Sequence, residues 1–365
     1  MNLPIMPIPA VMIDALYPHP NADKLEVAQI KGWHTVVAKG YYKVGQIVLY
    51  LPIDTVIPTS IESLIFSPDS KIKLKDSRIR TIKIRGVISQ GLIISAATLK
   101  LPHLELGMDY GANLGVHKYE PPIEGISLSV GSQSVSPKNI NPNFLKYTKL
   151  ENFKNHPMLF ESGESIIVTE KIHGTNFRAG YIKIPANTLW KKFLQLIKYL
   201  PKYEFIFGSH NQQLSNYELS EPKSIYAKIV SKYNLQDKLK PNRVIYGEIY
   251  GHGIQTGYSY GCGKQEFKLA VFDARISGVY LSYNIFVSFC QALGLPSVPL
   301  LYRGPYSLET IQALAKGSST LCLFPTVREG IVIRHELEGH SSIGRKILKF
   351  INEEYLLNSK NTDFH

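Results

Sequence analysis

The sequence predicts an α+β protein of two domains, a small all-β barrel followed by a larger domain of antiparallel sheets and helices. Three observations support this expectation. Residues 9 to about 120 contain short apolar runs separated by Gly and Pro, which is typical of a small barrel. From about residue 151, strand patterns alternate with helical ones. With 365 residues, the chain is also longer than a single core usually permits.

The first domain is expected over residues 1–125, with a Greek-key barrel as its architecture. Its clearest strand patterns are at 34–39, 46–52, 80–86 and 91–95. The stretch 121–143 is rich in Pro, Gly, Ser and Asn and shows no periodicity. A linker is therefore expected at residues 126–150.

The second domain is expected over residues 151–365. Its strands are predicted near 164–170, 204–208, 243–250, 267–273, 329–335 and 345–351. A helix is predicted at 188–200, with one apolar stripe formed by Leu189, Phe193, Leu196, Ile197 and Leu200. We expect this stripe to pack against the protein and leave the lysines of the other face in solvent. A helix that turns its basic face to phosphates is the alternative.

The charge of the chain favours a polyanionic partner. Its 41 Lys and Arg outnumber its 29 Asp and Glu, which gives a net charge of +12. Nucleic acid or an anionic membrane surface would each fit. The sequence has no apolar run of the roughly 18 residues that a membrane span needs and no secretory signal, so we expect no membrane partner and an intracellular location, in cytoplasm or nucleus. The three widely spaced cysteines favour a reducing compartment over a disulfide framework.

Lys171 is the most informative single residue. It follows the apolar, β-branched run 165–169, which predicts a buried strand, and it precedes His-Gly-Thr-Asn, which predicts the turn that ends that strand. The ammonium is therefore expected at the rim of a core, where burial and nearby cations favour the neutral, nucleophilic amine. Gly174 is expected to let a phosphate-bearing ligand approach the backbone. For an isolated K-x-x-G, a surface lysine before an ordinary turn would be the better interpretation.

Four later segments carry the other groups that chemistry at this lysine would need. Glu248 stands in a predicted strand between two glycines and could hold ribose hydroxyls or a metal. Phe272 ends an apolar strand and, taken alone, would be interpreted as core. Glu329 begins a strand, and Lys349 lies between apolar residues, where burial is costly without an anion such as phosphate. Together these groups suit transfer of a nucleotide to lysine.

The motifs also resemble those of a known superfamily. Six of them occur in order: EKIHGTN (170–176), FGSHN (207–211), YGEIYG (246–251), VFD (271–273), REGIVIR (328–334) and ILKF (347–350). This order resembles the covalent nucleotidyltransferase superfamily of polynucleotide ligases and capping enzymes. The chain is most similar to the ATP-dependent RNA ligases of the Deinococcus type, which carry an N-terminal OB-fold module, and the stretches 19–52 and 77–95 share in the resemblance.

The resemblance implies a monomeric ATP-dependent RNA ligase that uses Mg²⁺ or Mn²⁺. Lys171 would take AMP from ATP, the AMP would pass to a 5′-phosphate end, and a 3′-OH would attack that end to form a phosphodiester and release AMP. Nicks in duplexes with an RNA 3′-OH end are the substrate that the family suggests.

The resemblance also implies roles for individual residues. The chemical steps would rest on Lys171, Lys349, Lys346 and Glu248. The nucleotide site would include Glu170, Ile172, Asn176, His210, Glu248, Phe272, Glu329 and Lys349. Within it Phe272 would stack on adenine, Lys349 would contact the α-phosphate, and Glu248 and Glu329 would hold the metal. Either Arg345 or Lys346 would be the second cation of the last motif.

His173 is a departure from the commonest form of the first motif, K-x-D-G, because it replaces the carboxylate. The Deinococcus-type branch shares this histidine. A structural His173, hydrogen-bonded in the turn, and a catalytic one are equally open.

Two alternatives remain at this point. HPNADKLEV (19–27) resembles the opening of tRNA-binding OB domains, so the chain could be a non-catalytic RNA-binding protein. A GTP-using capping-type nucleotidyltransferase is the other, although only a short tail follows Lys349, where capping enzymes usually carry their OB domain. In the ligase interpretation, the first domain would bind nucleic acid through Lys73, Lys75, Arg78, Arg80, Lys83 and Arg85.

Overall fold

The computed structural model describes residues 5–66, 73–119, 140–186, 188–214, 219–220, 222–255, 257–322, 324–358 and 361. The chain divides into two compact units. The first consists of Met1–Pro122, Glu151–Phe160 and Phe350–His365, and the second of Ile123–Leu150 and Glu161–Lys349. None of the helices in the described ranges has the length and apolar character that crossing a bilayer requires.

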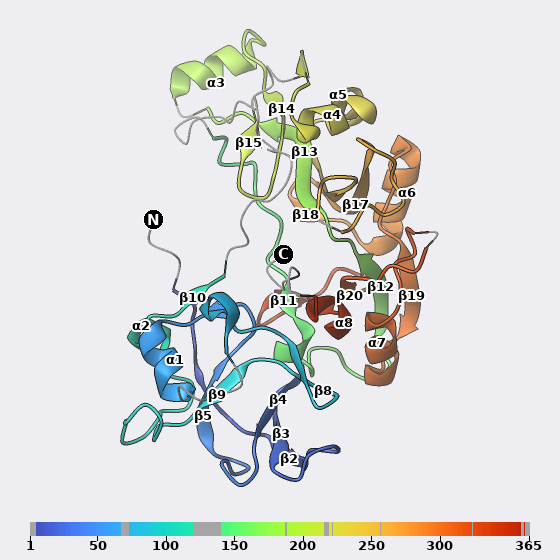
Figure 1. The fold of residues 1–365 in the computed structure, drawn as a ribbon. Coiled ribbons are helices and arrows are strands. Elements are labelled where there is room, and N and C mark those ends of the chain that lie inside the picture. Colours follow the sequence, from blue (N-terminus) through green and yellow to red (C-terminus); the bar gives the residue numbers. More distant parts are fainter. Residues whose placement is uncertain are drawn as a thin grey trace. The chain divides into compact units, whose positions relative to one another are not determined.

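The first unit is built from short antiparallel sheets (Figure 1). Its strands are β1 (Ala10–Met12), β2 (Ala15–Pro18), β3 (Leu25–Ile30), β4 (Trp33–Ala38), β5 (Ile47–Leu51), β6 (Thr55–Val56), β7 (Ile82–Ile84), β8 (Val87–Ser89), β9 (Leu92–Ile94), β10 (His117–Lys118) and β11 (Glu151–Asn152). Its helices are α1 (Thr59–Ile65), α2 (Gly111–Leu114) and α8 (Glu353–Leu356). The strands expected from the apolar runs are confirmed as β4, β5, β7 and β9. Leu49, Leu51 and Ile94, on paired strands, form the centre of the core.

Lys154 joins the three chain segments of the first unit. Its side chain is buried, and its Nζ atom donates to the side chains of Gln90 and Glu353. The same ammonium lies 5.2 Å from the centre of the Trp33 ring. A buried lysine is tolerated only when its charge is compensated in this way. The segments 151–160 and 350–365, which we expected to belong to the second domain, therefore pack with the first.

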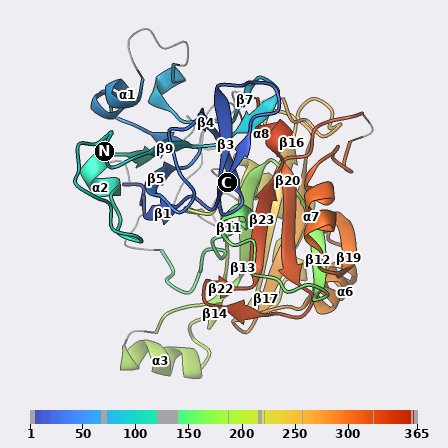
Figure 2. The same cartoon turned by 90° about the horizontal axis from the view of Figure 1, so that it is seen from below.

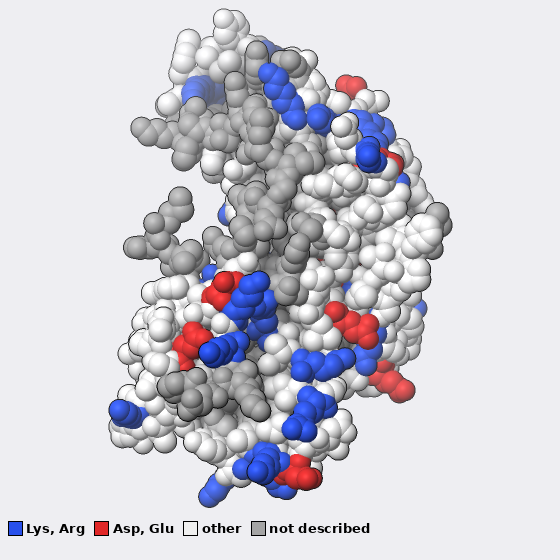
Figure 3. All heavy atoms as spheres, viewed as in Figure 1, with Lys and Arg blue, Asp and Glu red and all other residues white. Residues whose placement is uncertain are grey.

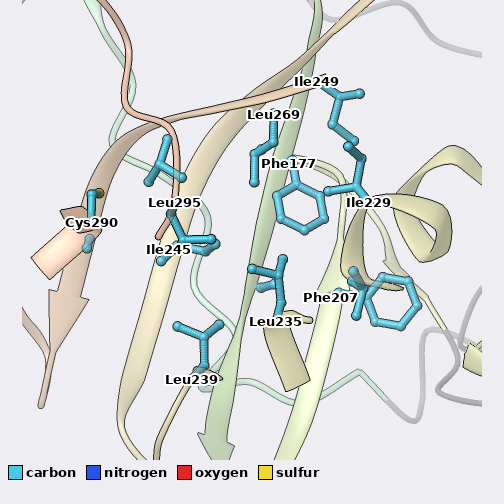
Figure 4. Close-up of a cluster of buried hydrophobic side chains, with 14 of the residues drawn as sticks. Phe177, Phe207, Ile229, Leu235, Leu239, Ile245, Ile249, Leu269, Cys290 and Leu295 are labelled. Atoms are coloured by element: carbon cyan, nitrogen blue, oxygen red, sulfur yellow. The ribbon is translucent and has the colours of Figure 1, made fainter. Parts of the chain in front are cut away.

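A six-stranded antiparallel sheet forms one layer of the second unit, in the order β15-β14-β13-β16-β17-β18. Its strands are β13 (Thr175–Lys183), β14 (Tyr203–Gly208), β15 (Gln213–Leu214), β16 (Arg243–Gly251), β17 (Phe267–Ile276) and β18 (Val279–Tyr280). Helices α4 (Ile225–Lys232), α5 (Leu235–Lys238) and α6 (Tyr283–Leu293) supply side chains to the core on one face. Figure 4 shows Phe177, Ile245, Ile249 and Leu269 of the strands meeting Ile229 and Leu235 of the helices.

The second sheet of this unit contains β23, β20, β12 and β19 in that order, drawn side by side in Figure 2. Its elements and their neighbours are β12 (Ser165–Lys171), β19 (Leu300–Pro305), α7 (Leu308–Ala315), β20 (Gly330–His335), β21 (His340–Ser341), β22 (Gly344–Arg345) and β23 (Ile347–Ile351). The strands predicted for the second domain are thus confirmed, and so is the α+β class. They were predictable because their buried runs are apolar and β-branched.

Two expectations for the second unit differ from what the structure contains. Residues 140–150 fell in the expected linker, but Phe144 and Tyr147 are buried there, and Tyr147 bonds to Asp273 at 2.9 Å. The part of the expected linker before residue 140 lies outside the described residues. The helix expected at 188–200 is present as α3 (Leu189–Leu196), but the prediction that its apolar stripe packs on the protein is wrong, because Leu189 is 85% exposed and Leu196 is 71% exposed.

Candidate active site

Lys171 and Glu329 form an ion pair at one end of the second sheet. The strand β12 ends at Lys171, which pairs in register with Gly330, the first residue of β20. Glu329 directly precedes β20, so the same register brings its side chain beside the lysine. The Nζ atom of Lys171 donates to Oε1 of Glu329 at 2.6 Å, and both side chains are nearly inaccessible to solvent. The predicted strand–turn arrangement therefore does place this ammonium at the rim of a core.

Glu248 brings a second carboxylate to this pair from the other sheet. It is opposite Asn176 in the β13–β16 register, and because Phe177 and Ile249 point into the core, Asn176 and Glu248 point away from it. Burial raises the pKa of Glu248 to about 8, the positive charge of Lys171 opposes this shift, and the negative charge of Glu329 adds to it. The carboxyl group is therefore largely protonated at neutral pH in the absence of a bound cation.

Asn176 carries a buried polar atom that is available to a ligand. Its Oδ1 atom has no hydrogen-bond partner among the described residues. An unsatisfied buried acceptor costs about 1–3 kcal/mol, so a site that leaves one in place usually has a ligand donor to satisfy it. The atom lies on the strand face shared with Glu248, where a sugar hydroxyl or an amino group of a base could reach it.

The turn after Lys171 is held by a segment that the sequence analysis did not single out, residues 252–266. The Tyr260 hydroxyl accepts a hydrogen bond from the backbone N–H of His173 at 2.7 Å, and Gln255 donates to the carbonyl of Gly174 at 2.7 Å. These two bonds fix the backbone immediately after Lys171. The crowding of Gly and Tyr between two strong strands, as in YSYGCG (258–263), is the signal that could have identified this segment.

His173 is a neutral, buried residue of this turn. Burial, together with the charge of Lys171, lowers its pKa to about 3. The ring meets Tyr258 edge-on at 4.9 Å between centroids. An imidazole in this setting does not serve as a proton donor near neutral pH. Of the two roles left open by the sequence, the geometry favours the structural one.

The structure gives a packing reason for a glycine at position 174, and the expected approach of a phosphate there stays a prediction. A Cβ atom there would lie 2.3 Å from the carbonyl oxygen of Ile249 and 2.8 Å from Cγ of Glu248. Gly174 is therefore required by close packing of the turn on β16, the strand that carries Glu248. This packing sets the distance between the turn and the second carboxylate.

Phe272 lies on the same face of the six-stranded sheet as Glu248, since its neighbour Val271 belongs to the core. Its ring is half-buried and meets the Tyr147 ring in a T-shaped contact at 4.8 Å. Stacking of Phe272 on a base remains a prediction. Tyr147 is a neighbour that the sequence did not identify, because it fell in the expected linker.

The two candidates for the second cation of the last motif lie away from Lys171. Lys346 pairs with Glu164 at 2.7 Å, and its carbonyl accepts from the N–H of His335, which is level with Ile166. At about 3.3 Å per residue, this is about 16 Å along β12 from Lys171. Arg345 is buried against Asp273, with 2.8 Å between Nη2 and Oδ2. In this structure Arg345 and Lys346 are therefore each paired with a carboxylate.

The other residues expected at the nucleotide site lie on several different strands and turns. Glu170 points to the opposite side of β12 from Lys171, where its carboxylate accepts from the N–H and hydroxyl of Thr320. Ile172 is buried in the turn. His210 lies two residues after Gly208, which pairs with Arg178 in the sheet, and burial together with nearby cations lowers the pKa of His210. Lys349 is buried in β23, with β20 between it and the strand of Lys171.

The residues expected to bind nucleic acid lie in the first unit, and one differs from the rest. Arg78 is buried, bonds to Asp54 and stacks on the Tyr119 ring at 3.8 Å, so its guanidinium supports the fold. Arg80 is half-buried. The exposed members of the set are Lys73, Lys75, Lys83 and Arg85. Lysine and arginine side chains also gather on the visible face of this unit in Figure 3.

The carboxylates of the site suit a metal that is held partly by a phosphate ligand. Among the described residues, no cluster of three or more His, Cys, Asp or Glu side chains could hold a metal ion. Glu248 and Glu329 are two carboxylates near one lysine. Mg²⁺ is commonly bound by one or two carboxylates plus substrate phosphates, and this donor set fits that pattern.

Two family models match the chain. The family model described as RNA ligase matches residues 164–351, and an OB-fold domain model matches residues 9–96. No curated protein sequence matches the chain. Among solved structures, the Naegleria gruberi RNA ligase with pyrophosphate is 23% identical, with a TM-score of 0.75 over 97% of this chain and 99% of that one.

Further structures of the Naegleria gruberi ligase are similar to the same degree. A mutant with ATP and Mn is 23% identical, with a TM-score of 0.74 over 96% of this chain and 98% of that one. A mutant with AMP and Mn is 23% identical, with a TM-score of 0.75 over 97% and 99%. At this identity the likeness shows a shared fold. The family match at residues 164–351 covers more than half of the 365 residues and includes Lys171, Glu248, Glu329 and Lys349, so the chain belongs to the RNA ligase family, with an OB-fold domain at its N-terminal end.

Proposed function

We propose that this RNA ligase uses ATP to join an RNA 3′-OH end to a 5′-phosphate end through a lysyl-AMP intermediate on Lys171, and that its substrate is a nick in a duplex. The observation that carries this proposal is the buried ion pair of Lys171 with Glu329, with the Glu248 carboxyl close to both. A lysine that is oriented by one carboxylate and shielded from water is suited to attack phosphorus.

In the first step, Nζ of Lys171 forms a bond to the α-phosphorus of ATP, and the bond from that phosphorus to the pyrophosphate oxygen breaks. The ammonium of Lys171 first gives one proton to the Glu329 carboxylate, which already accepts a hydrogen bond from Nζ, and the neutral amine then attacks. The second proton, lost as the N–P bond forms, leaves with the pyrophosphate. In the later steps the AMP moves to the 5′-phosphate, and the 3′-OH displaces it. The Naegleria gruberi structures with ATP and Mn, with AMP and Mn and with pyrophosphate contain the ligands of such a step.

Other residues would bind and orient the nucleotide. Phe272 would contact the base, the free Oδ1 of Asn176 would accept from a sugar hydroxyl or base amino group, and Lys349 would neutralise phosphate charge. A Mg²⁺ or Mn²⁺ ion, held by Glu248, Glu329 and the phosphates, would supply electrostatic stabilisation of the charge on the phosphate oxygens. Cation binding would also favour the ionised form of Glu248.

We infer the substrate class from the OB-fold domain of the first unit and from the net positive charge of the chain. An OB-fold domain with exposed cations suits a nucleic-acid strand, whose phosphates its lysines and arginines would contact. We further propose that the protein acts as a monomer inside the cell, where its three free cysteines would remain reduced.

A sealing assay tests the proposal. A nicked duplex with an RNA 3′-OH end and a 5′-phosphate would be compared with the same nick carrying a DNA 3′-OH and with the unannealed single strands. We expect ATP-dependent sealing that is fastest on the RNA-ended nick and is lost in Lys171→Ala. Equal sealing of single strands would contradict the nick preference, and sealing with GTP in place of ATP would contradict the choice of nucleotide.

A further inference from the structure

Helix α3 interrupts a hairpin that needs no helix. The strands β13 and β14 are paired as far as Lys183 and Tyr203, and residues 184–202 connect them. A hairpin usually closes with two to five residues, and longer connections without a structural need are often functional. Lys183, the end of β13 from which the connection to α3 starts, is eight positions from Thr175 and so lies about 26 Å along the strand from the turn that follows Lys171. The helix is therefore remote from the site of nucleotide transfer.

The helix turns its polar side to the protein and its apolar side outward. Gln195 is its one buried residue, and the Gln195 amide lies 3.5 Å from the Ile184 carbonyl and 3.4 Å from the Pro201 carbonyl at the two ends of the connection. Trp190 is 65% exposed and Phe193 is 47% exposed. Figures 1 and 2 both show α3 projecting from the second unit. An ordinary surface helix has the opposite orientation.

The exposed apolar side contains aliphatic and aromatic side chains in equal number. It comprises Leu189, Trp190, Phe193, Leu196, Ile197 and Tyr199. The two aromatic rings nearest its centre, Trp190 and Phe193, stack on each other with centroids 5.6 Å apart. Leucine and isoleucine offer no face on which a base could stack, and the stacked rings already partner each other. The surface is thus better suited to an apolar phase than to single-stranded RNA.

Positive charge borders this apolar side. Lys191 and Lys192 are exposed on α3, Lys198 follows it, and the sequence contains no Asp or Glu from residue 183 to residue 203. On a helix, residues 191 and 192 fall at the edges of the side that carries Gln195. Long lysine stems at such edges let the ammonium groups rise to a polar layer while the apolar side chains lie below it.

Although the sequence led us to expect no membrane partner, we propose that α3 is a peripheral membrane anchor that lies in the surface of a bilayer rich in anionic lipid. Its apolar side chains would enter the boundary between headgroups and acyl chains, and its lysines would contact the lipid phosphates. The complementarity of charge selects an anionic surface over a neutral one. A helix of this length buries little apolar area, so the binding is weak, reversible and dependent on lipid charge, and it brings the ligase to a surface without a membrane span.

Vesicle flotation tests this anchor directly. The full-length protein would be mixed with vesicles of phosphatidylcholine alone or of phosphatidylcholine with phosphatidylserine. We expect flotation with the anionic vesicles only, weakened at least about tenfold by the double change Trp190→Ser, Phe193→Ser, and roughly fivefold for each of Lys191→Ser and Lys192→Ser. The matched control is Ile285→Ser on α6, a residue that is 58% exposed outside the proposed surface.

Tryptophan fluorescence supplies a second measurement. The chain has two tryptophans, and Trp33 is buried in the first unit, so a blue shift on addition of anionic vesicles would report Trp190. Circular dichroism and lysyl-AMP formation would confirm that the variants are folded, because α3 is remote from Lys171. Absence of flotation with anionic vesicles, or equal flotation of the double variant, overturns the proposal. A loss of RNA affinity in the double variant without any vesicle binding also overturns it, in favour of an RNA contact.

Discussion

Lys171 and Glu329 are 158 positions apart in the sequence, yet Nζ of one lies 2.6 Å from Oε1 of the other. The pair exists because β12 and β20 are antiparallel neighbours whose ends coincide at Lys171 and Gly330. Only 1% of the Glu329 side chain is exposed, so the positive charge of Lys171 compensates a carboxylate that water barely reaches. Lys171 is thus positioned by the register of two strands.

This dependence predicts a non-additive pair of substitutions. Lys171→Met leaves a buried carboxylate without its cation, and Glu329→Gln leaves the ammonium without its anion, so each should lower the free energy of unfolding by about 3 kcal/mol. The double variant should regain most of the loss, because neither charge remains. Urea unfolding of the four proteins measures the coupling. Additive losses would show that the pair is not a coupled unit.

Glu248 should make stability depend on pH. Its pKa is raised from 4.5 to about 8 in the folded protein, so between these values the folded state keeps a proton that the unfolded chain has released. The free energy of unfolding therefore falls as pH rises from 4.5 to about 8. Above about pH 8 the folded state carries the whole destabilisation that comes from ionising this buried carboxyl group. Glu248→Gln removes the cost. We expect the variant to melt above the wild type at about pH 8 and at the same temperature at about pH 4, in the absence of metal and nucleotide. A constant difference across pH would contradict the shift.

Tyr260 should affect the rate of lysine adenylylation without contacting ATP. Tyr260→Phe removes the acceptor for the His173 N–H, and an unsatisfied buried donor costs about 1–3 kcal/mol. If the turn is displaced as a result, adenylylation of Lys171 should slow by about tenfold. Tyr250→Phe, which removes a hydroxyl from the ring that packs on Tyr260, is the control. Equal rates for Tyr260→Phe and wild type would mean that the bond does not position the turn.

The basic residues of the first unit should separate into two groups. Lys83→Ala removes an exposed cation and should weaken RNA binding. It should also make the slope of log affinity against log salt concentration shallower, by about the amount that one phosphate contact contributes. Arg78→Ala should instead lower the melting temperature, since it leaves Asp54 buried without its cation. Filter binding at several salt concentrations and thermal melting distinguish the two. A salt slope that Lys83→Ala leaves unchanged would remove that lysine from the interface.

Much of the fold and of the candidate site could be predicted, because local sequence patterns determine which segments form the strands. The strands of Lys171, Glu248 and Glu329 are apolar, β-branched runs, and the order of the motifs identified the residues that meet. The side of a helix that faces the protein was not predictable for α3, since the stripe of Leu189 and Phe193 has the period of a packed helix whether or not anything covers it. The ion-pair partners of Arg345 and Lys346 could not be predicted either, because Asp273 and Glu164 come from distant segments of the sequence.

The central claim is that Lys171 becomes covalently adenylylated, and the intact mass of the protein after incubation with ATP and Mg²⁺ tests it most directly. We predict that the wild type gains the mass of one AMP and that Lys171→Ala gains none, whereas Lys346→Ala, whose ammonium pairs with Glu164, still forms the adduct. An AMP adduct that persists in Lys171→Ala, or a wild type that gains no mass with ATP, would contradict the account.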